Sequence, residues 1–334
     1  MAAFARFIAI RFGAAVVVML LVSLIVFTLM ELVPGNCAER YIAYKQTQGQ
    51  VITEADIRAE EVRMGLDRPY LERWVSWVSG VFLRFDLGES CLWRVDVAQL
   101  IGDKIWISLG LCFAALILTY AIAVPVGMAS AMLRDGWFDS SLRIISYLGL
   151  AIPNFLLALG IMLLSTVFFG ETLTGLFSDE LRDAPWSAEK LADMLSRAWL
   201  PILILGWSAT AIQLQTVRAL ISDEKDKLYV TAARARGLSG AQLMMRYPAR
   251  HALGPVVNSI GFDLNRIFND LPIVAAVLVL TDAGALLLDA LARSNDQQLA
   301  GAIILLLTAT IVALNFLTDI LLAVIDPRVR KGFF

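Results

Sequence analysis

The chain has 334 residues, of which 58% are hydrophobic and 17% are charged, with a mean hydropathy of +0.71. Soluble globular domains are about 45–50% apolar and about 25% charged, so this composition argues against a water-soluble enzyme. A net charge of −2 provides no basic surface for nucleic acid, and one histidine with three cysteines leaves little material for a metal or cofactor site. The composition predicts an all-α, polytopic membrane protein.

Six apolar stretches are long enough to cross a bilayer, because a hydrocarbon core of about 30 Å needs roughly 20 helical residues. They lie at about 8–33, 105–133, 142–170, 200–221, 255–281 and 299–325. The first is longer than the apolar region of a signal peptide and no A-x-A cleavage site follows it, so we expect it to be retained. We expect one membrane domain over 1–334, with a first span (1–33), an outer segment (34–104) and a core of five spans (105–334).

The connections between the spans fall into basic and acidic sets that alternate along the chain. The 218–253 connection has seven basic and three acidic residues, whereas the 171–199 connection has six acidic and three basic residues. The N-terminus has Arg6 and Arg11, and the tail has Arg328, Arg330 and Lys331. Because short cytoplasmic loops are enriched in Lys and Arg, both termini are predicted to be cytoplasmic.

The outer segment is predicted to be helical. Thr53 is a suitable N-cap before Glu54 and Asp56, and a second helix is expected from Pro69 to about Phe82. On that helix Trp74 and Trp77 lie three residues apart, on one face. This spacing suits the membrane interface or a neighbouring subunit, and local packing within a small cap is the alternative.

Two of the three cysteines, Cys37 and Cys91, fall in this outer segment, and Cys112 falls in the second span. An oxidising outer compartment permits a disulfide between Cys37 and Cys91. Two unpaired thiols are the alternative.

The second outer loop, 171–199, is expected to contain an amphipathic helix that starts after Ser187. Pro201 is expected to open the following span. The chain has no phosphate-binding loop, HExxH, GxSxG or CxxC motif, so energy from ATP would have to come from another chain.

Charged residues inside the fifth span form the most informative cluster. Asp263, Arg266, Asn269 and Asp270 share one helix face, and ionisable groups inside a membrane normally face a bundle interior or a watery path. One interpretation is a polar wall of a substrate pathway, with Arg266 flanked by two carboxylates. The other is an internally paired stripe that fixes this helix to a neighbour. Asp319 and Asn315 in the sixth span are interpreted as helix–helix contacts, and His251 as a surface or docking residue.

The 223–256 loop has helix signals that simple positive charge does not explain. Acidic residues at 223–226 suit a helix start, Gly237 should end a short helix that begins near Tyr229, and Ser239 should cap a second helix from Ala241 to Arg246. We interpret the pair as a rigid docking element.

At this loop the sequence resembles the permeases of binding-protein-dependent ABC importers, specifically the B-type subunit of oligopeptide and dipeptide systems. Their EAA-like signature, Tyr-x-x-Thr-Ala-Arg-Ala-Lys-Gly-Leu followed by Arg and Pro, here reads Tyr229-Val230-Thr231-Ala232-Ala233-Arg234-Ala235-Arg236-Gly237-Leu238, with Arg250 and Pro255. Thr231 stands at the Glu position of the EAA triplet.

Five other segments also resemble this family, in the same order along the chain. They are Val33-Pro34-Gly35, Gly65-Leu66-Asp67-Arg68-Pro69, Asp86-Leu87-Gly88-Glu89-Ser90, Ile152-Pro153-Asn154-Phe155 and Asp326-Pro327-Arg328-Val329-Arg330. The chain departs from the family after the fifth span, where the usual Glu-x-x-Phe-x-x-Pro-Gly-x-Gly is replaced by the residues from Ala275 to Gly284.

The resemblance implies a type I importer permease fold in a bacterial inner membrane and a non-catalytic subunit without cofactor. It implies four kinds of partner: a C-type permease in a heterodimer, one or two cytoplasmic ATPases, a periplasmic solute-binding protein and membrane lipid. Residues 229–237 would couple to an ATPase. The resemblance makes peptides the first candidate for the transported solute, and oligosaccharides, opines, glutathione and metal chelates are further candidates.

Two rival functions use the charged stripe differently. A proton-coupled secondary transporter would use Asp263, Arg266 and Asp270 as a relay, but such folds usually contain internal repeats and none is visible. An intramembrane enzyme would use Asp263 and Asp270 as a pair, but seven helical residues separate them by about 10 Å, too far to share a proton.

Overall fold

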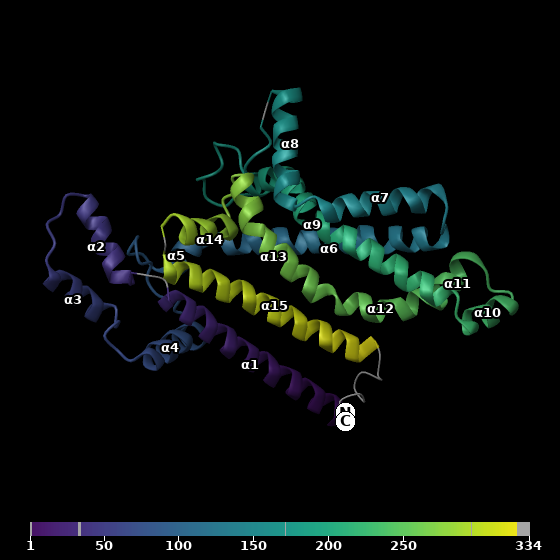
Figure 1. The fold of residues 1–334 in the computed structure, drawn as a ribbon, viewed down its shortest axis with the longest axis horizontal. Helices are drawn as coiled ribbons and strands as arrows, with labels where there is room; N and C mark the ends of the chain where they lie inside the picture. The colour runs from purple at the N-terminus through teal and green to yellow at the C-terminus, as the bar shows by residue number, and fades with distance from the viewer. Residues whose placement is uncertain (1, 33–34, 171, 295, 326–334) are drawn as a thin grey trace.

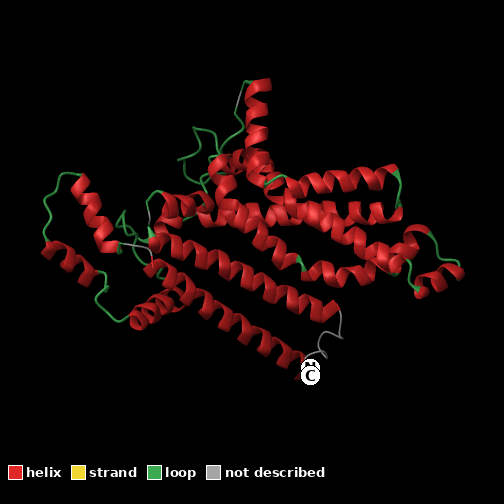
Figure 2. Cartoon of the chain, viewed as in Figure 1, coloured by secondary structure: helices red, strands yellow, loops and turns green. Residues whose placement is uncertain are grey.

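The computed structural model describes residues 2–32, 35–170, 172–294 and 296–325. In these ranges the chain forms fifteen α-helices and one π-helical turn, and the only strand-like pairing described is an isolated antiparallel bridge between Glu89 and Asp96 (Figure 2). The predicted all-α class is confirmed. The predicted Val33-Pro34-Gly35 motif extends beyond the described residues, and the predicted motif at 326–330 and basic tail lie outside them.

Four helices are long and apolar enough to cross a membrane by themselves, and they run along the long axis of the molecule (Figure 1). They are α1 (Ala2–Leu32), α6 (Lys104–Met132), α9 (Ala188–Lys225) and α15 (Gln297–Ile325). At about 1.5 Å per residue each is longer than a bilayer core of about 30 Å. They correspond to the predicted first, second, fourth and sixth spans.

The predicted continuous helix over 142–170 is wrong, because this region forms two helices. α7 (Trp137–Ala151) and α8 (Asn154–Phe169) meet at 100°, and α8 projects sideways from the bundle (Figure 1). The bend falls at Ile152, which is extended with ψ 115°, immediately before Pro153. A proline ring disfavours the helical conformation of the residue that precedes it, which explains why the break falls at this position. Counted as one bent span, the pair brings the apolar spans to five.

The predicted fifth span is also divided. α12 (Pro248–Asn258) ends at Ser259 and α13 (Ile260–Val277) begins directly after it. α13 carries Asp263, Arg266 and Asp270 within 18 residues, so it is less apolar than the four long spans. It nevertheless lies among them and packs against α6, α9 and α15.

α9 is a single helix of 38 residues that extends beyond the predicted span at both ends. Ser187 caps its start as predicted, accepting a hydrogen bond from the Lys190 amide at 3.1 Å. The expectation that Pro201 opens a separate span is wrong, because Pro201 lies inside α9. A membrane helix can contain a proline where neighbouring helices and local adjustments of the backbone satisfy the hydrogen-bonding groups that the proline leaves free. Asp223 and Glu224 close α9 instead of opening the next helix.

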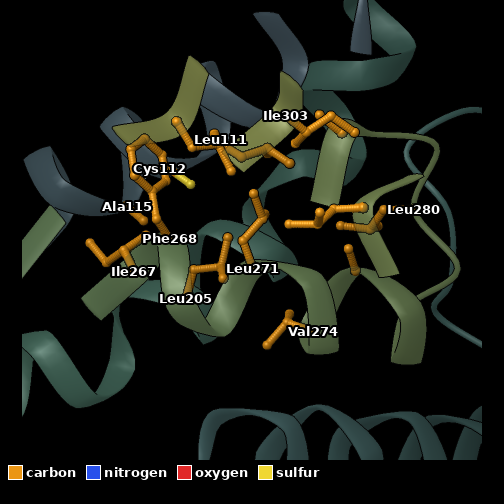
Figure 3. Close-up of a cluster of buried hydrophobic side chains, with 14 of the residues drawn as sticks. Leu111, Cys112, Ala115, Leu205, Ile267, Phe268, Leu271, Val274, Leu280 and Ile303 are labelled. Carbon is orange, nitrogen blue, oxygen red and sulfur yellow. The ribbon is translucent and has the colours of Figure 1, made fainter. Parts of the chain in front are cut away.

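The centre of the bundle is an apolar core built from α6, α9, α13 and α15. Side chains from all four helices meet there, and Cys112 is fully buried among them (Figure 3). The labelled members are Leu111, Cys112, Ala115, Leu205, Ile267, Phe268, Leu271, Val274, Leu280 and Ile303. The buried face of α13 thus belongs to this core, and its opposite face remains open.

The most extensive helix–helix contact in the described bundle is between α6 and α9. Their backbones approach at Gly127, where an added Cβ would lie 2.9 Å from the Leu214 carbonyl oxygen and 3.0 Å from the Val217 side chain. Membrane helices associate through packing of small residues, because lipid provides no hydrophobic driving force between them.

The outer segment consists of α2 (Cys37–Thr47), α3 (Glu54–Arg63), α4 (Tyr70–Ser79), the π-turn η1 (Gly80–Arg84) and α5 (Val97–Ile101). Thr53 and Asp56 form a capping box at the start of α3. α4 rests on the end of α1, where Arg73 binds both carboxylate oxygens of Glu31 at 2.6 and 2.7 Å and Trp77 packs against Phe27. This contact favours local packing as the role of Trp77.

Gly127→Ala is expected to destabilise the detergent-solubilised protein by about 1–3 kcal/mol, because the methyl group overpacks the α6–α9 contact. Gly110→Ala is the matched control on the same helix, since no atom lies within 4 Å of the added Cβ. That variant should gain about 0.5–1 kcal/mol from reduced backbone entropy of the unfolded chain. Thermal unfolding compares the two, and equal midpoints would contradict the assignment of this contact.

Candidate functional site

Two short helices form a hairpin at the end of the molecule opposite the outer segment (Figure 1). α10 (Leu228–Ala235) is followed by Gly237 at φ +91°, a left-handed conformation that glycine adopts without steric cost. Ser239 precedes α11 (Gly240–Arg246). The helix–break–helix pattern predicted for this loop is confirmed, and we call residues 228–246 the helical hairpin.

A small apolar cluster holds the hairpin together. Val230, Ala233 and Leu243 are buried in it, and Leu238 packs against them. The Tyr229 ring lies 6.1 Å from the ring of Tyr247 and 5.2 Å from that of His251, and its hydroxyl donates a hydrogen bond to Glu224. Burial, with the Glu224 carboxylate, raises the pKa of Tyr229 to about 12, so the hydroxyl keeps its proton at neutral pH.

A second apolar cluster fixes the hairpin to the bundle. Met244 of α11 and Ala249, Ala252 and Val256 of α12 pack against α6 and α9, at the ends of these two helices that lie near the hairpin. Beside this cluster, Asp139 of α7 is fully buried and accepts hydrogen bonds from Arg218 at 2.5 and 2.7 Å and from Ser130 at 2.5 Å. A buried ion pair with complete hydrogen bonding is costly to break, so α6, α7 and α9 are held as one unit where the hairpin attaches.

The outer surface of the hairpin presents most of the residues that sequence analysis assigned to coupling. Thr231, Ala232, Arg234, Arg236, Gly237 and Arg250 are exposed, whereas Ala233 is buried and Tyr229 is half-buried inside the hairpin. The first group is available for contact with another protein, and Tyr229 and Ala233 hold the two helices in place.

Asp263 lies on the buried side of α13. Its carboxylate accepts hydrogen bonds from Tyr120 of α6 at 2.7 Å and from Gln213 of α9 at 2.6 Å, and both donors also contact Ser259. The network joins three helices at the α12–α13 break. Sequence analysis missed Tyr120 and Gln213, although each is a polar residue in an otherwise apolar span, which is the signal that could have identified them.

The other members of the predicted stripe face differently. Asp270 accepts a hydrogen bond from Asn154 of α8 at 2.8 Å, Asn269 is exposed and Arg266 is half-buried. Among the described residues Arg266 forms no hydrogen bond or ion pair, and its Nη1 atom is buried without a partner. The structure therefore divides the stripe into a buried anchor, Asp263, and an open polar face formed by Arg266, Asn269 and Asp270.

The polar residues Asp319 and Asn315 of α15 contact other helices. Asp319 pairs with Arg11 of α1 at 3.2 Å, which agrees with its interpretation as a helix–helix contact. Asn315 approaches Gly261 of α13 and so marks a second close contact of α15.

Cys37 and Cys91 are joined by a disulfide with a Cα–Cα distance of 5.1 Å, across 54 residues of sequence. The neighbouring Ser90 donates a hydrogen bond to Asp296, a buried residue that caps the start of α15. Gln298 of α15 donates to the Leu87 carbonyl at 3.0 Å. The disulfide thus closes the outer segment where it rests on α15.

Comparisons with known proteins agree with this arrangement. Residues 123–331 match the family described as the binding-protein-dependent transport system inner membrane component, and residues 4–95 match the N-terminal part of such membrane components. A Brucella abortus protein described as a peptide transport system permease is 29% identical over 96% of this chain and 97% of its own length. The nickel import system permease NikB of Staphylococcus aureus is 25% identical, over 96% of this chain and 90% of its own length.

Among solved structures, a chain of the MetNI methionine ABC transporter in an inward-facing conformation aligns with a TM-score of 0.54. The identity is 17%, and the alignment covers 68% of this chain and 97% of that one, which establishes a shared fold.

The long apolar helices, with a hairpin at one end and a polar helix face inside the bundle, define a multi-pass helical membrane protein. The match over 123–331 identifies the chain as a member of the family of inner membrane components of binding-protein-dependent transport systems. It is therefore a multi-pass permease subunit of an ABC importer, and ATP hydrolysis belongs to a separate subunit.

The disulfide predicts a defined alkylation pattern. In denaturant without reductant, one of the three cysteines, Cys112, should react, and all three should react after reduction. Intact-mass analysis counts the adducts, and three adducts without reductant would contradict the bond. The Cys37→Ser/Cys91→Ser double variant should lose about 2–4 kcal/mol of stability.

Asp263→Ala is expected to cost about 1–3 kcal/mol, because it leaves the buried Tyr120 and Gln213 donors without their acceptor. Asp263→Asn keeps one acceptor oxygen and should lose less. Asn265→Ala, an exposed position on the same helix, is the control and should leave the unfolding midpoint unchanged. An Asp263→Ala protein as stable as this control would show that the network contributes nothing.

Proposed function

We propose that this subunit forms half of the translocation pathway of an importer for peptides or a related small polar solute. Support comes from the relatives described as a peptide permease and a nickel permease, each similar along nearly the whole chain. The proposal treats residues 1–334 as one permease domain. A C-type permease would supply the other half of the pathway, one or two ATPases the energy, and a periplasmic binding protein the solute.

In this proposal the helical hairpin is the coupling element. Its exposed face carries Arg234 and Arg236, Arg250 is exposed nearby at the start of α12, and the buried cluster of the hairpin keeps its face rigid. Seated in a cleft of an ATPase, the hairpin would move when the ATPases close on ATP. The observation that carries this proposal is the attachment of α11 and α12 to α6 and α9, because any displacement of the hairpin then moves the helices that pack around α13.

The two ends of the bundle support the proposed orientation in the membrane. The outer segment, with its disulfide, lies at one end, and the hairpin with its basic face lies at the other (Figure 1). Disulfides persist in oxidising compartments and basic loops remain in the cytoplasm, so the outer segment would be periplasmic and both termini cytoplasmic.

Reconstitution tests the importer function. The chain should purify from its native membrane with a second permease and with chains that carry phosphate-binding loops, identified by mass spectrometry. In vesicles, uptake by this complex with its binding protein should require ATP and be insensitive to a protonophore. Collapse of uptake by the protonophore at constant ATP would instead support the self-contained, proton-coupled transporter.

Charge reversal at the hairpin should separate hydrolysis from transport. Arg234→Glu with Arg236→Glu, or Gly237→Pro, is expected to lower transport roughly tenfold or more, because the ATPase contact loses its charged residues or its shape. Membrane insertion should be intact. Arg293→Glu, at an exposed arginine outside the hairpin, is the control. Transport at the wild-type rate in the hairpin variants would show that this surface does not couple.

A further inference from the structure

The open face of α13 has a regular composition. Its exposed positions, spaced by three or four residues, are Phe262, Asn265, Asn269, Ile273 and Ala276. Arg266 and Asp270 lie half-buried along the same face. The opposite side of the helix is fully packed into the core (Figure 3). The open face is therefore polar in its middle and apolar at both ends.

The Arg266 guanidinium is incompletely hydrogen-bonded within the described part of the chain. The carboxylate of Asp263 is bound to Tyr120 and Gln213, and that of Asp270 is bound to Asn154, at distances of 2.6–2.8 Å. All three donors are neutral. Nη1 of Arg266 is buried without a hydrogen-bond partner, and no ion pair to either aspartate is present among the described residues.

A guanidinium inside a membrane protein is costly unless an anion or hydrogen-bond acceptors compensate it. Its planar fork of donors fits a carboxylate with two parallel hydrogen bonds. The carboxylates of Asp263 and Asp270 are hydrogen-bonded to other side chains, so an acceptor from outside the chain would complete the hydrogen bonding of the guanidinium. The exposed neighbours Asn265 and Asn269 leave this position accessible from the open face.

Asp270 supplies the opposite charge one turn further along. Residues four apart on a helix have Cβ atoms about 5–6 Å from each other, so a cationic and an anionic side chain lie next to each other on this face. The buried Oδ1 of Asn154, which holds Asp270, also lacks a donor. This acceptor adds to the affinity of that position for an ammonium group.

We infer that the open face of α13 binds a zwitterionic solute during transport, with Arg266 contacting its carboxylate and Asp270 its ammonium group. This inference rests on the proposed importer function and assigns the substrate class to one helix face. The solute would meet these groups after it has left the binding protein. The face would therefore discriminate between solutes a second time, independently of the binding protein.

The test compares matched forms of the same peptides. The complete importer in vesicles, with its binding protein, receives a mixture of peptides of two to five residues, each present as the free peptide, as the C-terminal amide and as the N-acetylated form. Mass spectrometry of the vesicle contents gives two uptake ratios, acid to amide and free to N-acetylated. The uptake ratio of each variant is divided by that of the wild type. Because the same binding protein is present in both measurements, its own preference cancels.

Arg266→Gln should lower the acid-to-amide ratio about tenfold, the value expected for one charge-assisted hydrogen bond, and Arg266→Lys should restore it in part. Asp270→Asn should leave that ratio and lower the preference for free over N-acetylated peptides. Arg293→Gln, at an exposed residue of the α14 (Ala283–Ala292) to α15 connection, is the control that should change neither ratio.

The outcomes separate the two proposals. If the wild type accumulates no peptide with ATP, peptide import and the inference built on it both fail. If the wild type transports and Arg266→Gln keeps the wild-type acid-to-amide ratio, the inference alone is wrong, and a loss of complex assembly in that variant would assign Arg266 to a carboxylate of a partner subunit.

Discussion

α6 and α9 approach each other at Gly127, where there is no room for even one methyl group, and the other elements are arranged around this contact. Lipid gives helices no hydrophobic reason to associate, so close packing of small residues has to provide the contact energy. One side of the pair packs against α13 through the apolar core and the Asp263 hydrogen bonds. Another side contacts α7 through the buried Asp139–Arg218 ion pair. The hairpin is attached to its end. Displacing this pair therefore displaces every group to which a transport role has been assigned.

The geometry also separates two kinds of charge within α13. Asp263 has its hydrogen bonds satisfied by Tyr120 and Gln213 and lies on the side of the core, at the break between α12 and α13. Arg266 lies three residues further along and faces the open side, and its Nη1 atom has no hydrogen-bond partner among the described residues. A satisfied buried carboxylate fixes a helix, whereas an unsatisfied guanidinium is available for another molecule. One short helix thus combines an anchoring side with a side on which solute can be recognised.

Local signals in the sequence were sufficient where one residue determines the backbone. Gly237 ends α10, Ser187 starts α9 and Thr53 starts α3, each as predicted, because caps and left-handed turns depend on neighbours within a few residues. Errors arose where a proline has two possible effects. Pro201 remains inside α9, but Pro153 bends the chain by 100°, and only the packing of other helices decides between these outcomes. The partners of Asp263 and Asp270 come from three other helices, so the separation of the stripe into two sides could not be derived from spacing along α13 alone.

The disulfide and the contact beneath it impose an order on biosynthesis. Cys37 and Cys91 belong to the first third of the chain, whereas Ser90 binds Asp296, a residue 206 positions later. Oxidation requires both thiols to be outside the cytoplasm, so the two spans that flank them have to be inserted before the bond can close. The surface of α15 on which the segment finally rests is made last. The early segment can therefore be closed covalently before α15 is synthesised, and α15 then completes the contacts that position it.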